Sequence, residues 1–71
     1  MIDVKINSDF IKLDQFLKLS NITSTGGHSK LLIKEGLVKV NGEIEMRRGK
    51  KLVHGDIVEI EDEKLRVLKE D

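Results

Sequence analysis

The sequence predicts an α+β domain in which two short helices pack on a small, mostly antiparallel sheet of four to five short strands. Apolar residues recur at helical spacing between residues 13 and 35, whereas they alternate with polar residues before and after this segment. Strands that follow a run of helices favour an α+β arrangement with antiparallel neighbours. The 71 residues are enough for one domain, residues 1–71, and too few for a second.

The first strand is predicted over residues 1–6, where three aliphatic residues alternate with charged ones. A turn follows at residues 7–9. A helix is predicted over residues 13–20 because Leu13, Phe16 and Leu17 recur at helical spacing, and Asn21 is expected to end it.

The second helix is predicted over residues 28–35. Thr25 is placed to cap its first turn through the side-chain hydroxyl. Gly36 suits the left-handed residue that commonly ends a helix. Lys30 and Lys34 are four residues apart, so they lie on one face of this helix.

After Gly36 the apolar period changes to two, which predicts strands. Asn41-Gly42 is a strong hairpin signal, because both residues tolerate positive φ. Residues 47–51 form a basic loop, and further strands are predicted at residues 57–60 and 65–68. The helix pair is expected to cover one face of the sheet. The predicted core consists of Leu13, Phe16, Leu17, Leu31, Leu32, Val38, Val40, Ile57, Ile60 and Val67.

The net charge is zero, but the charges are unevenly distributed along the chain. Residues 28–51 carry seven Lys and Arg against three Glu, whereas residues 52–71 carry three basic residues against seven acidic ones. The positive excess in the middle of the chain favours a polyanion as partner. The alternative is that both blocks are solvated faces that promote solubility.

Nothing in the sequence indicates an enzyme or a metal site. The chain has no cysteine, and neither His28 nor His54 lies in a zinc-binding pattern. His54-Gly55-Asp56 fits a turn better than a catalytic group. We therefore predict no catalytic residue, no metal and no cofactor. The sequence has no long apolar run, so we expect a cytoplasmic protein without a membrane partner. With two Phe and no Trp or Tyr, base stacking is not expected to be the binding mode.

The segment before the second helix is suited to an anion. Thr25-Gly26-Gly27 combines free backbone amides with the positive end of a helix, and glycine allows a phosphate to approach the backbone. Alone, this pattern is better explained as a flexible helix entry. Lys30 and Lys34 extend the positive field, and the loop at residues 47–51 extends it further if it folds beside the helix. Such a composite surface fits a phosphate backbone.

Several segments together resemble the S-four-type RNA-binding domain (αL motif), the module named after the fourth protein of the small ribosomal subunit. These segments are Leu13-Asp14-Gln15-Phe16-Leu17-Lys18, Ser29-Lys30, Leu32-Ile33, Gly36-Leu37-Val38-Lys39-Val40-Asn41-Gly42-Glu43, Lys51-Leu52 and Gly55-Asp56-Ile57-Val58. Residues 25–30 and the loop at residues 47–51 resemble the stand-alone YaaA/YbcJ-like bacterial branch.

The resemblance implies binding to structured RNA, with ribosomal RNA foremost and transfer RNA as a second option, through the face of the helix pair and the following hairpin. The residues that it implies in RNA contact are Lys12, Ser24, Thr25, Gly27, Lys30, Lys34, Arg47, Arg48, Lys50 and Lys51. Lys12 departs from the pattern, since many family members carry arginine there. Lysine keeps the charge but loses the bidentate geometry toward phosphate.

The sequence therefore predicts a monomeric RNA-binding module that acts in ribosome assembly or translation, with the ribosomal subunit as a further partner. The alternative is a protein-interaction module. In that case the acidic residues among 59–63, together with Glu70 and Asp71, would dock a basic ribosomal or RNA-processing protein.

Overall fold

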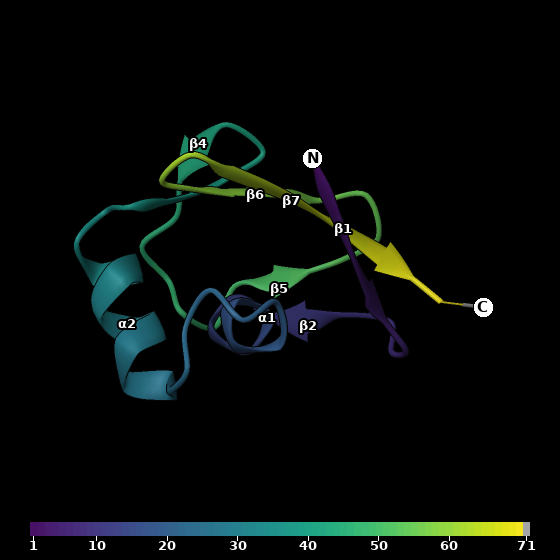
Figure 1. Ribbon diagram of the computed structural model, residues 1–71, viewed down its shortest axis with the longest axis horizontal. Helices are drawn as coiled ribbons and strands as arrows, with labels where there is room; N and C mark the ends of the chain where they lie inside the picture. The colour runs from purple at the N-terminus through teal and green to yellow at the C-terminus, as the bar shows by residue number, and fades with distance from the viewer. Residues whose placement is uncertain (71) are drawn as a thin grey trace.

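The computed structural model describes residues 1–70 and confirms the predicted α+β class (Figure 1). Its elements, in chain order, are β1 (Ile2–Ile6), β2 (Ile11–Lys12), α1 (Leu13–Leu19), α2 (Gly26–Lys34), β3 (Val38–Val40), β4 (Glu43–Ile44), β5 (Lys51–Leu52), β6 (Ile57–Ile60) and β7 (Glu63–Lys69).

The strands form two sheets. The larger has five strands in the order β1-β7-β6-β3-β4, and the smaller consists of β2 and β5. All neighbouring pairs are antiparallel except β1 and β7, which run parallel. The small sheet was not predicted, because strands of two residues are too short to show a period of two.

The five-stranded sheet and the helices lie on opposite sides of the core, and the β2–β5 sheet lies on the helix side, next to α1 (Figure 1). The buried apolar residues are Ile6, Leu13, Phe16, Leu17, Ile33, Val38, Val40, Leu52, Val58, Ile60, Leu65 and Val67. Of the predicted core, only three positions fail: Leu31 is 52% exposed, and Leu32 and Ile57 are half-buried.

The failure at Leu31 has a simple cause. Residues 31–33 are all apolar, so the sequence does not specify which of them faces inward. In the structure Ile33 and Ser29, four residues apart, form the buried face of α2. Ser29 is tolerated in the core because its hydroxyl shares a hydrogen bond with the buried hydroxyl of Thr23, 2.5 Å away.

Both helices end in the same way. Asn21 after α1 has a φ of 63°, and Gly36 after α2 has a φ of 75°. In each case the amides of this residue and of the next one close a Schellman motif on the last turn; after α2, Gly36 N donates to Ile33 O at 3.1 Å and Leu37 N donates to Leu32 O at 3.2 Å. The predicted ends of both helices are confirmed. The predicted start of α2 at residue 28 is wrong by two residues: Thr25 is the N-cap, and the glycines form the first turn.

The predicted turn at Asn41-Gly42 is confirmed, with positive φ at both residues. Asn41 also joins two distant segments. Its side-chain amide donates to Asp56 Oδ1 at 3.0 Å and its side-chain oxygen accepts from Ile57 N at 2.9 Å. Asp56 in turn accepts from Val53 N at 2.9 Å. Asn41-Gly42 and Gly55-Asp56 therefore meet, and these hydrogen bonds fix the hairpin to the turn between β5 and β6.

Candidate nucleic-acid interface

The basic loop at residues 47–51 is fixed to the start of α1 by backbone hydrogen bonds. Leu13 N donates to Lys50 O at 2.9 Å, and Asp14 N donates to Arg48 O at 3.1 Å. These bonds satisfy two of the amides that a helix start leaves without a partner. The loop carbonyls point at α1, and the side chains of Arg48 and Lys51 are exposed.

The loop also contacts α2. Lys30, Ile33 and Lys34 line a pocket of about 300 Å³ together with Met46 and Arg48. The structure thus brings together basic residues that are at least 14 positions apart in the sequence. The composite surface expected from the sequence required the loop to fold beside α2. In the structure Arg48 of the loop lines the same pocket as the α2 lysines.

Lys12 and Lys51 meet in the small sheet, where they are direct cross-strand partners. Both are exposed, and neither belongs to an ion pair among residues 1–70. Like charges directly opposite each other destabilise a strand pair. Lys12 is also the N-cap residue of α1, where a cation is unfavourable next to the positive end of the helix. Both effects are relieved by a bound anion.

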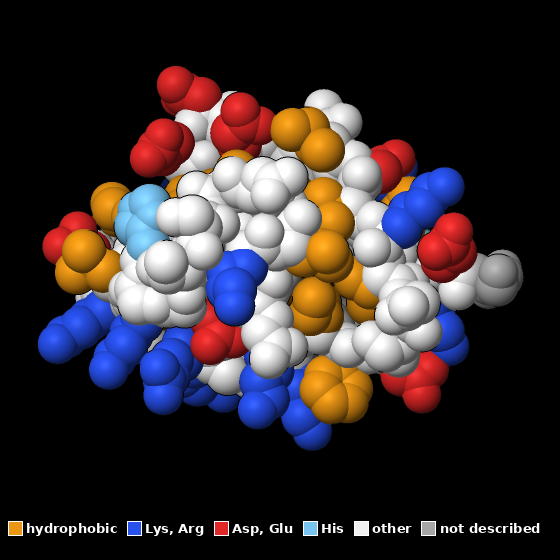
Figure 2. Space-filling view, turned by 60° about the horizontal axis from the view of Figure 1, so that its bottom comes forward, with side chains coloured by type: hydrophobic (Ala, Val, Ile, Leu, Met, Phe, Trp, Pro, Cys, Tyr) orange, Lys and Arg blue, Asp and Glu red, His pale blue; other side chains and the backbone are white. Residues whose placement is uncertain are grey.

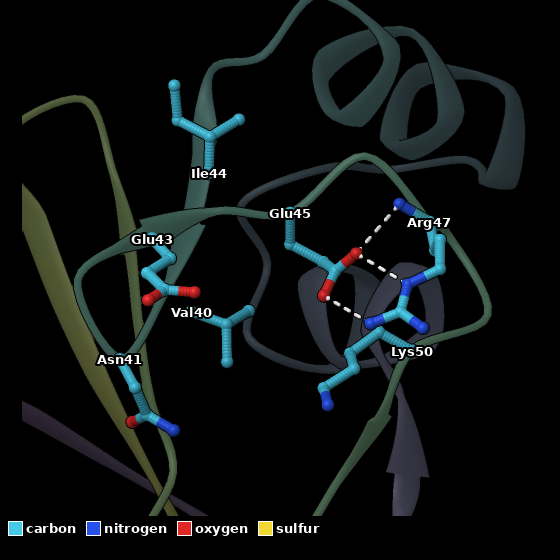
Figure 3. Close-up of a pocket in the computed structure, with 7 residues that line it drawn as sticks. All are labelled: Val40, Asn41, Glu43, Ile44, Glu45, Arg47 and Lys50. Carbon is cyan, nitrogen blue, oxygen red and sulfur yellow. Dashed lines mark hydrogen bonds and ion pairs between the residues drawn. The ribbon is translucent and has the colours of Figure 1, made fainter.

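The exposed side chain of Arg47 forms an ion pair with Glu45 (Figure 3). Its Nε donates to Glu45 Oε2 at 2.9 Å and its Nη2 donates to Oε1 at 3.1 Å. These bonds lower the pKa of Glu45 and raise that of Arg47. Lys50 lines the same pocket of about 320 Å³. Glu45 therefore occupies the Nε–Nη2 edge of the Arg47 guanidinium, and the rest of the group stays accessible to an anion.

Ser24, Thr25 and Gly27 are exposed at the start of α2. The hydroxyl of Thr25 accepts a hydrogen bond from His28 N at 3.1 Å, which confirms its capping role. None of the three lines the pocket between α2 and the loop. They therefore form a separate part of the candidate interface.

Charges of opposite sign lie at different edges of the molecule. In Figure 2, Lys and Arg side chains form a row along the lower edge, and a group of carboxylates lies at the upper left. Arg66 and Lys69 of β7 form ion pairs with Asp3 and Asp9, at 2.9 and 2.6 Å. Of the Lys and Arg residues on the helices, the small sheet and the loop, Arg47 alone forms an ion pair among residues 1–70.

Sequence reasoning missed Met46 and Phe10. Met46 is 57% exposed and lines the pocket with the α2 lysines. Phe10 is 42% exposed, and the centroid of its ring lies 4.8 Å from Lys51 Nζ. The available signal for Phe10 was its position two residues before Lys12, which places the two side chains on the same side of an extended segment.

Within residues 1–70, neither His28 nor His54 belongs to a cluster of metal-ligating side chains. Among residues 1–70, no group of three His, Asp or Glu side chains could hold a metal ion. The turn at His54-Gly55-Asp56 is confirmed, with a φ of 93° at Gly55. His54 Nδ1 accepts from Lys69 N at 2.9 Å, which is a structural contact. Within the described part of the chain, neither helix is long and apolar enough to cross a membrane.

Known proteins are similar to this chain in sequence. "Probable ribosome maturation protein RlbA" of Bacillus subtilis (strain 168) is 47% identical over 58 residues, which cover 82% of each chain. "Putative RNA-binding protein YbcJ" of Escherichia coli (strain K12) is 40% identical over 48 residues, which cover 68% of this chain and 69% of YbcJ.

Two solved structures superpose on this chain. The solution structure of YbcJ from E. coli, described as revealing an αL motif involved in RNA-binding, has a TM-score of 0.74 at 30% identity and covers 96% of this chain and 87% of that one. The 30S ribosomal protein S4e from Thermoplasma acidophilum shares the fold, with a TM-score of 0.64 at 23% identity, over 84% of this chain and 32% of that one.

The family assignment follows from these matches and from the residues described above. Residues 4–68 match the S4 domain family, which covers both helices and nearly all of the two sheets. The segments that carry the resemblance form the helix pair and the Asn41-Gly42 hairpin, which is bonded to Asp56. This chain belongs to the S4 domain family and has the αL-motif fold.

Proposed function

We propose that this chain binds structured RNA, ribosomal RNA foremost, through a continuous basic surface. We define the basic surface as Lys12, Lys30, Lys34, Arg48, Lys50 and Lys51, with Arg47 and the α2 start (Ser24, Thr25 and Gly27) at its margin. The observation that carries the proposal is the pocket in which Lys30 and Lys34 of α2 meet Arg48 of the loop. Three cations gathered from two elements, with no acidic ion-pair partner among residues 1–70, suit a phosphate backbone.

The relatives indicate where such binding would act. RlbA is named for ribosome maturation and YbcJ for RNA binding. By this analogy the chain acts as a cytoplasmic monomer during assembly of a ribosomal subunit or in translation, and it has no catalytic role. Transfer RNA is the second candidate ligand.

Salt dependence is the first test. If the six cations of the basic surface each neutralise one phosphate, the slope of log K against log salt is about −4 to −5. Raising the salt from 50 to 200 mM then weakens binding about 10³-fold. Filter binding or fluorescence anisotropy with a ribosomal RNA fragment measures this slope. Binding that is insensitive to salt over this range contradicts the electrostatic model.

A double charge reversal tests the location. Lys30→Glu with Lys34→Glu is expected to abolish RNA binding at 100 mM salt, because it replaces two attractive contacts with two repulsive ones. The control is Lys5→Glu with Lys64→Glu, which changes the net charge equally on exposed positions of the five-stranded sheet. Both variants should keep the wild-type circular dichroism spectrum. Equal loss in the two variants would show that net charge, and not the α2 face, governs binding.

One observation favours a second function, docking of a basic protein. The carboxylates of Glu59, Glu61, Asp62 and Glu63 have no ion-pair partner among residues 1–70, although Lys64 is the cross-strand partner of Glu59. Asp71, part of the same predicted surface, lies outside the described residues. A pull-down with and without ribonuclease separates the two functions: partners that survive digestion support protein docking.

A further inference from the structure

The small sheet presents one face to the core and one to solvent. Ile11 and Leu52 are cross-strand partners; Leu52 is fully buried, and Ile11 packs against the core. Their neighbours Lys12 and Lys51 therefore project from the other face, because side chains alternate along a strand. Phe10, two residues before Lys12, projects from this same outer face. Its position explains how Lys51 Nζ reaches 4.8 Å from the ring centroid.

Phe10 is an unusual residue for this molecule. The sequence contains two Phe and no Trp or Tyr, and Phe16 is fully buried. Phe10 is thus the exposed aromatic side chain of the chain, with 42% of its surface accessible. Lys51 Nζ lies over its ring, and Lys12 is the cross-strand partner of Lys51.

The backbone on both sides of Phe10 is fixed. Asp9 forms an ion pair with Lys69 of β7 at 2.6 Å, and Ile11 pairs with Leu52. The carbonyl of Phe10 itself accepts from Ser8 Oγ at 2.8 Å. These contacts restrict the backbone at Phe10, which reduces the ordering cost of a contact made by its side chain.

We propose that Phe10 is a stacking position for an unpaired base of the bound RNA, with Lys12 and Lys51 contacting the phosphates on either side of that nucleotide. In the free protein Lys51 Nζ lies over the ring, and stacking of a base on that face moves the ammonium toward a phosphate. The aromatic face and the two cations then combine the two components of single-strand recognition, stacking and backbone neutralisation. The inference rests on the proposed RNA binding and narrows the ligand to a structured RNA with an unpaired nucleotide beside a helix. It also revises the expectation from composition: aromatic residues are too few for a stacking platform, but one is placed where stacking is possible.

The test compares two RNAs that differ in one feature. One is a hairpin whose stem contains a single bulged adenosine, and the other is the same stem fully paired. Phe10→Ala is expected to weaken binding of the bulged RNA about tenfold or more, while binding of the paired stem changes less than about twofold. Phe10→Tyr, which keeps the ring, is expected to restore the preference for the bulged RNA. Equal effects of Phe10→Ala on the two RNAs would overturn the inference.

A direct spectroscopic readout is available because the chain has no tryptophan. Phe10→Trp introduces a single indole, whose fluorescence is expected to be quenched when the bulged adenosine stacks on it. The matched control is Ile2→Trp, at a position that is 48% exposed in β1 and paired with Leu65 of the five-stranded sheet. Quenching at both positions, or at neither while the RNA is bound, would contradict stacking at Phe10. If wild-type protein shows no salt-dependent binding to either RNA, the proposed function fails and this inference fails with it.

Discussion

The two sheets of this molecule differ in the charges of their cross-strand partners. In the five-stranded sheet, charged residues face partners of opposite sign: Asp3 lies opposite Arg66 and forms an ion pair with it, and Glu59 lies between Lys39 and Lys64. In the two-stranded sheet, Lys12 faces Lys51. Opposite charges across a strand pair stabilise it, and like charges destabilise it.

This difference separates charged residues that stabilise the free protein from charged residues that favour binding to a polyanion. The five-stranded sheet has an arrangement that stabilises the free protein. The small sheet has an arrangement that is unfavourable in the free protein and favourable next to a polyanion. Arg47 is the intermediate case, because it is a cation of the basic loop that forms an ion pair with Glu45.

The largest expected effect comes from detaching the small sheet from the core. Leu52 is fully buried in β5. Leu52→Ala removes its packing and leaves a cavity, which should lower the free energy of unfolding by about 2–5 kcal/mol. Urea denaturation followed by circular dichroism measures this loss. The control is Val53→Ala, since Val53 is 48% exposed and its truncation should cost no more than about 0.5 kcal/mol. Similar losses in both variants would mean that the core does not anchor the small sheet.

Lys12→Glu is expected to have a smaller effect, which raises the stability of the fold and weakens RNA binding. The substitution creates an opposite-charge pair with Lys51 and places an anion at the start of α1, so the free energy of unfolding should rise by about 0.2–1 kcal/mol. RNA binding should weaken at the same time. The reciprocal control is Asp3→Lys, which places like charges opposite each other in the large sheet and should lower the urea midpoint. A loss of stability in Lys12→Glu would contradict the proposed difference between the sheets.

The smallest effect concerns pH. The hydrogen bond from Lys69 lowers the pKa of Asp9, and the side-chain hydrogen bonds from Arg47 lower the pKa of Glu45. A carboxyl whose pKa is lower in the folded state adds stability above its unfolded pKa, and that stability is lost as the pH falls through the folded pKa. Asp9→Asn should therefore flatten the decline of stability below about pH 5 without changing the fold. Urea midpoints between pH 3 and 6 provide the measurement, and an unchanged slope would show that the exposed pair contributes nothing.

The residues that determine local structure were readable from the sequence. Asn21 and Gly36 end the helices, Thr25 caps α2, and Asn41-Gly42 turns the hairpin, because each of these depends on the conformational preference of one or two residues. Most of the core was predicted too, where the period of apolar residues was unambiguous. The prediction failed at Leu31, inside a run of three apolar residues, because only the packing of α2 on its neighbours selects which one is buried.

The candidate site, too, was predictable only in part from the sequence. The sequence supplied its residues, namely the lysines of α2 and the basic loop, because charge is a property of each residue. Their assembly depends on contacts that no periodicity records: Arg48 and Lys50 carbonyls on the first amides of α1, and Arg48 beside Lys30 and Lys34. The same holds for Glu45, which the sequence did not connect with Arg47.

By itself, then, the sequence determined the fold class, the helix ends, the hairpin and the uneven distribution of charge, since these follow from short-range preferences and from composition. Only the tertiary structure decided that β1 pairs in parallel with β7, that Lys12 faces Lys51, and that Phe10 is exposed beside them. The physical reason is that register and burial are set by segments up to 63 residues apart, through packing that is cooperative across the whole domain.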